Sequence, residues 1–130
     1  MISKIFNIEL WDNFVEVLNE SFQKLNDSKI GFSIGDTGKT VLIKVDNQEI
    51  TSQLINGSIM NMDDFDLLFS VSEDIASQIL DEPTKLVEFI DSGQLNIFCM
   101  ANNSQIYQKG IDEFLKSLGF VRQRTCPLNI

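Results

Sequence analysis

A glycine-rich stretch ending in Gly-Lys-Thr has the residue types that could bind a phosphate. It reads SIGDTGKTVLI over residues 33–43. A P-loop needs a glycine five positions before the one that precedes the lysine, and Ser33 stands there. It also needs a following helix, whose N-terminus holds the phosphates. Residues 40–45 instead alternate apolar and polar side chains, as a strand does. We therefore predict a β-hairpin that turns at residues 35–38, and no nucleotide site.

Other catalytic and metal-binding groups are sparse. The chain has no histidine, which excludes His-based triads, an imidazole base and His-ligated zinc. Cys99 and Cys126 are far apart in the sequence; Cys99 lies in an apolar strand pattern and is predicted to be a small core residue. Asp63, Asp64 and Asp66 lack the spacing and glycine of a calcium loop, so we predict solvated side chains at a strand entry. No catalytic residue, metal or cofactor is expected.

Composition and charge limit the kinds of partner. The chain has 130 residues, 43% of them hydrophobic, which fits one globular domain spanning residues 1–130. Its net charge of −9 is spread along the chain, whereas binding to nucleic acid or an anionic membrane requires clustered Lys and Arg. No apolar run approaches ~20 residues, and the N-terminal residues make a poor signal peptide. We expect a cytoplasmic protein without stable membrane insertion.

Apolar periodicity predicts the secondary structure. A long helix is expected over residues 10–25, because Trp11, Phe14 and Phe22 belong to one apolar stripe. Strands are expected around residues 30–34, 40–45, 49–55, 65–71 and 94–100. Two short helices should begin near Ser72 and Pro83, and a closing helix should follow residue 104. This order predicts an α+β fold, with a five-stranded, mostly antiparallel sheet covered by helices.

The stretch FDLLFSVSEDIASQILDEPTKLVEFIDSGQLNIF, residues 65–98, resembles the sterol carrier protein type-2 (SCP2) family. The shared pattern is a strand, a short helix that begins Ser72-Glu73-Asp74, a second short helix, Gly93, and a strand that begins Leu-x-Ile. The resemblance covers most of residues 10–119. It implies an apolar cavity that holds a fatty-acyl chain, a sterol or an isoprenoid-like lipid, and a carrier role without catalysis.

The resemblance and the apolar pattern together predict which residues line the cavity. They lie on the strands and helices that bound the cavity in the family: Phe69, Phe89, Phe98, Met100, Tyr107, Ile111 and Phe114. Tyr107, Ile111 and Phe114 are expected to share one face of the closing helix. The alternative is a protein-interaction or accessory module without lipid, acting as a homodimer or as the partner of an enzyme.

Overall fold

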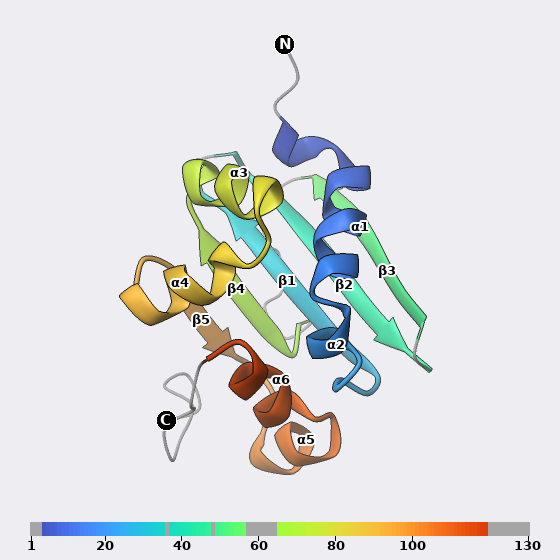
Figure 1. Ribbon diagram of the computed structural model, residues 1–130. Helices are drawn as coiled ribbons and strands as arrows, with labels where there is room; N and C mark the ends of the chain where they lie inside the picture. The colour runs from blue at the N-terminus through green and yellow to red at the C-terminus, as the bar shows by residue number, and fades with distance from the viewer. Residues whose placement is uncertain (1–3, 36, 48, 57–64, 120–130) are drawn as a thin grey trace.

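The computed structural model describes residues 4–35, 37–47, 49–56 and 65–119. Its centre is one five-stranded sheet with the order β3-β2-β1-β4-β5 (Figure 1). The strands are β1 (Ser28–Ile34), β2 (Lys39–Asp46), β3 (Glu49–Asn56), β4 (Leu67–Val71) and β5 (Asn96–Cys99). Three neighbouring pairs are antiparallel, and β1 pairs with β4 in parallel. The α+β fold and the mostly antiparallel sheet are therefore confirmed.

The stretch that resembled a P-loop is a β-hairpin, as predicted. β1 and β2 pair antiparallel, with Ile34 opposite Lys39. Gly38 has a φ of +69°, a left-handed conformation that suits glycine, and the chain continues from it directly into strand β2 rather than into a helix. Lys39 begins β2, and its ammonium group lies 5.2 Å from the centre of the Phe6 ring. This lysine therefore belongs to the packing of the N-terminal segment.

Short helices cover one face of the sheet (Figure 1). A 3-10 turn (η1, Lys4–Phe6) comes before α1 (Ile8–Val17) and α2 (Asn19–Phe22). The remaining helices are α3 (Glu73–Asp81), α4 (Lys85–Ser92), α5 (Asn103–Gln108) and α6 (Ile111–Ser117). None of the helices in the described ranges is long and apolar enough to cross a membrane. Their buried side chains form one hydrophobic core with the sheet residues beneath them.

Local signals set the ends of the middle helices as expected. Ser72 caps α3, because its Oγ accepts a hydrogen bond from the Ile75 N–H at 3.1 Å. α4 begins two residues after Pro83 and ends at Gly93, whose φ of +73° is typical of a helix C-terminus. Cys99 is buried, as predicted for a core residue, whereas Cys126 lies outside the described residues.

Two predicted helices are each divided in the structure. The first is interrupted at Leu18, so α1 and α2 replace one helix over residues 10–25. The closing helix is interrupted at Gly110, which takes a left-handed conformation between α5 and α6. The first break leaves Phe14 and Phe22 both buried, whereas at the second the left-handed Gly110 ends the 3.6-residue period.

Candidate functional site

A continuous group of aromatic rings fills the space between the helices and the sheet. We call it the aromatic layer: Trp11, Phe14, Phe22, Phe32, Phe69 and Phe114, all fully buried. Neighbouring rings of the layer contact one another. The ring centroids of Phe114 and Phe22 are 5.1 Å apart, and Phe32 stacks on Phe69 with centroids 4.8 Å apart. Phe14 connects these two pairs, at 6.4 Å from Phe22 and 5.5 Å from Phe32. The layer therefore reaches from α6, across the helices, to β4.

The aromatic layer contains one polar ring atom, and it is already paired. The indole N–H of Trp11 donates a hydrogen bond to the Ile5 carbonyl oxygen at 2.8 Å. This bond satisfies the one group of the ring that would be costly to bury alone. Among the described residues, no buried side-chain nitrogen or oxygen lacks a partner. The layer therefore presents apolar surface and no unpaired hydrogen-bonding group.

Four of the seven predicted cavity residues lie in the core on the helix side of the sheet. They are Phe69, Phe89, Ile111 and Phe114. Sequence reasoning missed the other rings of the layer, although the stripe through Trp11, Phe14 and Phe22 carried the signal. Neither Phe98 nor Met100 belongs to this core.

Phe98 lies on the opposite face of the sheet. It pairs with Leu68 in the β4–β5 ladder, whereas Ile97 pairs with Phe69. Leu68 and Phe65 lie close over Gly31 on that second face, where a methyl group would meet both side chains at 2.7–2.8 Å. The predicted residues therefore do not all converge on one space.

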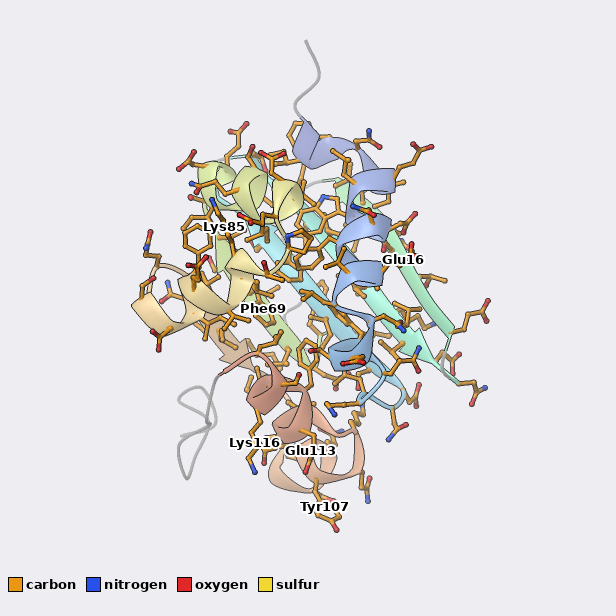
Figure 2. The ribbon with its side chains drawn as sticks, viewed as in Figure 1. Glu16, Phe69, Lys85, Tyr107, Glu113 and Lys116 are labelled. Carbon is orange, nitrogen blue, oxygen red and sulfur yellow. The ribbon has the colours of Figure 1, made fainter. Side chains whose placement is uncertain are left out.

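The prediction that Tyr107 shares a face with Ile111 and Phe114 is wrong. Its side chain is 86% exposed and points away from the sheet at the far end of α5 (Figure 2). The neighbouring Ile106 is buried instead. The cause is the break at Gly110, because the four-residue step from 107 to 111 assumed one continuous helix.

The junction between α5 and α6 is held against the turn that follows α2. The Asn26 N–H donates to the Lys109 carbonyl oxygen at 2.9 Å. At Gly110 the φ is +72°, and an added methyl group would collide with the Lys24 carbonyl oxygen. Glycine is therefore required here for its conformation and for the close approach of two backbones.

Asp66 fixes the same corner of the molecule. Its carboxylate accepts hydrogen bonds from the Lys29 N–H and the Lys109 ammonium group, both at 2.9 Å. Its backbone carbonyl accepts from the Met100 N–H at 3.0 Å. The side chain is only 13% exposed, so the prediction of a solvated Asp66 is wrong. Asp63 and Asp64 lie outside the described residues, and no group of metal-ligating side chains occurs in the part that the structure describes.

A hollow of about 360 Å³ lies beside this ion pair. We call it the corner hollow, and it is lined by Asp27, Lys29, Phe65, Asp66, Met100, Ala101, Gln105 and Lys109. Met100 is the one predicted cavity residue in its wall. Its walls include the charged side chains of the pair, so it does not suit a long apolar chain.

A larger open hollow, of about 510 Å³, runs between α1–α2 and β3. We call it the edge groove; its helical wall is Asp12, Val15, Glu16, Asn19 and Gln23, and its strand wall is Ile50, Thr51 and Ser52. Figure 2 shows Glu16 beside β3, which is one of the two edge strands of the described sheet. Sequence reasoning did not single out this groove, because it depends on which strand lies at the edge.

Comparison with known proteins gave similarities of structure alone. No family model and no curated protein sequence matches the chain. The UbiJ-SCP2 ubiquinone synthesis protein is similar at 13% identity and a TM-score of 0.47, over 85% of this chain and 90% of that one. Sterol carrier protein-2 like-3 from Aedes aegypti is similar at 13% identity and 0.48, over 85% and 97%.

A mutant of the sec-alkyl sulfatase PisA1 is also similar, at 15% identity and a TM-score of 0.44. This chain aligns over 76% of its own length and spans 13% of the sulfatase. Two of these three structures are SCP2 domains, the family that the sequence resembles. At these identities and scores, no ligand or activity is transferred from any of them.

Proposed function

We propose that this domain holds one apolar molecule, a fatty-acyl, sterol or isoprenoid-like lipid, between its helices and its sheet, and that it is not an enzyme. The aromatic layer is the observation that supports the proposal. Its six rings form a continuous apolar surface whose one polar ring atom is already paired. Flat rings offer a large contact area to a chain or a fused ring system. The resemblance of residues 65–98 to the SCP2 family supports the same function.

Within this proposal, the ligand contacts come from the helix side of the sheet. Phe69 lies beneath the ligand, and Phe89, Ile111 and Phe114 lie around it. Phe98 and Met100 belong to the other face and the corner hollow, and they do not share this site. Tyr107 is at the surface and contributes no wall.

Entry of the ligand requires the helices to move away from the sheet, because these rings are fully buried. Three of the covering helices, α2, α5 and α6, are short, and breaks separate α1 from α2 and α5 from α6. Helices of this length are not stable in isolation and depend on tertiary packing. A bound lipid would replace the contacts that the helices lose, so it should stabilise the folded protein.

Native mass spectrometry of the purified protein, followed by lipid extraction, tests the proposal directly. We expect a co-purified lipid. We also expect Phe114→Trp, which adds volume to the layer, to weaken binding of a fluorescent fatty acid to delipidated protein. Tyr107→Ala is the matched control, because it removes an aromatic ring from the surface. Absence of co-purified lipid together with no fatty-acid binding by the wild-type chain would reject this function.

The second candidate is a protein-interaction module without lipid. The observation that favours it is the edge groove, which runs along the edge strand β3 and is lined by none of the aromatic-layer residues. A stable partner or dimer from a lipid-free preparation would favour the module over the carrier.

A further inference from the structure

The outer side of β3 pairs with no other strand of the described residues. β3 is the last strand of the sheet, and it pairs with β2 over eight consecutive residue pairs without a bulge. In an antiparallel ladder, every second residue of an edge strand directs its N–H and C=O away from the sheet. Natural edge strands are usually protected by proline, lysine, a bulge or short length. β3 reads EITSQLIN and has none of these.

Helix α1 lies beside β3, and the two elements form the two walls of a groove. α1 packs against β3, and the edge groove of about 510 Å³ lies between them. The strand wall offers backbone groups, and Val15 and Ile50 add apolar surface. An edge strand beside a helix is the arrangement in which an extended peptide adds one more strand to a sheet.

The helical wall is acidic. Asp12 and Glu16 are exposed, four residues apart on α1, and neither forms an ion pair with a described residue. Two like charges at this spacing repel each other, so a cation between or beside them would relieve the repulsion. Four helical residues span ~6 Å, and alternate residues of an extended strand lie ~6.7 Å apart. Basic side chains at alternate positions of a bound strand therefore match the spacing of the two carboxylates.

We propose that the edge groove binds an extended segment of a partner protein that carries Lys or Arg at alternate positions. The segment adds a sixth strand to the sheet next to β3, and its basic side chains face Asp12 and Glu16. A second copy of this chain does not suit the groove. Pairing β3 with β3 would bring two acidic helical walls together in a protein of net charge −9. The inference is independent of whether the aromatic layer holds a lipid.

A labelled eight-residue peptide with lysine at alternate positions and Thr or Val between them is the probe. We expect its fluorescence anisotropy to rise on binding at low salt. We also expect slower amide hydrogen exchange along β3 in the complex. A peptide of the same design with glutamate in place of lysine should not bind.

Two variants separate the groove from general charge attraction. Asp12→Lys with Glu16→Lys should weaken peptide binding at least tenfold. Glu88→Lys with Asp91→Lys makes the same change in net charge on exposed positions of α4, and it should change the affinity less than threefold. Circular dichroism checks that both variants are folded, which we expect because all four side chains are exposed.

A peptide with N-methylated backbone amides tests strand addition itself, because it keeps the charges but cannot donate backbone hydrogen bonds. We expect it to lose binding. Equal binding of the N-methylated peptide, equal loss in both double variants, or no binding of the lysine peptide would each overturn the proposal. A wild-type dimer held through β3 would assign the groove to a second copy and overturn it as well.

Discussion

Truncation of Phe114 measures how tightly the aromatic layer is packed. The ring is fully buried and lies 5.1 Å from Phe22. Removal of the Phe114 ring loses the free energy of its transfer from water to the apolar interior, which alone should destabilise the protein by ~2 kcal/mol. If the surrounding groups cannot collapse, the cavity adds to this, and Phe114→Ala should cost ~3–5 kcal/mol in total. The Phe22 ring lies directly against Phe114, so we expect the higher range in lipid-free protein.

Urea unfolding of delipidated protein, monitored by circular dichroism, measures the change in the free energy of unfolding. The unfolding midpoint should fall while the slope with denaturant stays unchanged. A domain of this size is stable by only ~5–15 kcal/mol, so Phe114→Leu provides a milder variant that should cost roughly 1–2 kcal/mol.

Tyr107→Ala is the control, with an expected change within ~0.5 kcal/mol because the side chain is 86% exposed. If Phe114→Ala costs no more than Tyr107→Ala, the ring does not lie in a packed layer and our placement of the site is refuted. A cost near ~2 kcal/mol would indicate that the ring borders space that is already empty.

Three further predictions test the structure outside the aromatic layer. Gly110→Ala should destabilise the protein by more than Gly93→Ala. Both glycines have φ near +72°, but only at Gly110 would the added methyl group meet a backbone carbonyl. The difference between the urea midpoints of the two variants therefore measures the cost of that contact. Asp66→Asn should cost ~1–3 kcal/mol, because it removes a charge that accepts two hydrogen bonds, and an unchanged thermal midpoint would contradict this role. Ser72→Ala removes the cap of α3 and should cost ~1 kcal/mol by the same measurement, with no effect on ligand affinity.

Local sequence determined the elements that depend on neighbouring residues. The alternation on both sides of residues 35–38 predicted the hairpin, which rejected the P-loop interpretation. Ser72 and Gly93 predicted the start of α3 and the end of α4, because caps act within one turn of a helix. Composition and apolar periodicity were also enough to predict an α+β fold with a mostly antiparallel sheet.

Tertiary structure decided which side chains meet. The parallel pairing of β1 with β4 joins strands that are distant in the sequence, and it sets Phe69 opposite Phe32. The same pairing leaves β3 at the edge and so creates the edge groove. A strand pattern shows which residues alternate but not which face meets the helices, so the opposite placements of Phe69 and Phe98 were not visible in the sequence.

The breaks in the helical cover were not predicted from the sequence either. No strong breaker stands at Leu18, and Gly110 alone does not reveal that another backbone passes beside it. The left-handed turn at Gly110 leaves Tyr107 at the surface, and Ile106 packs in the core instead. Asp66 lies in an acidic stretch that suggested a solvated side chain, and it is partly buried in an ion pair with Lys109, 43 residues away in the sequence. Sequence periodicity holds within one unbroken element, whereas a binding site is assembled from several elements whose contacts the whole fold selects.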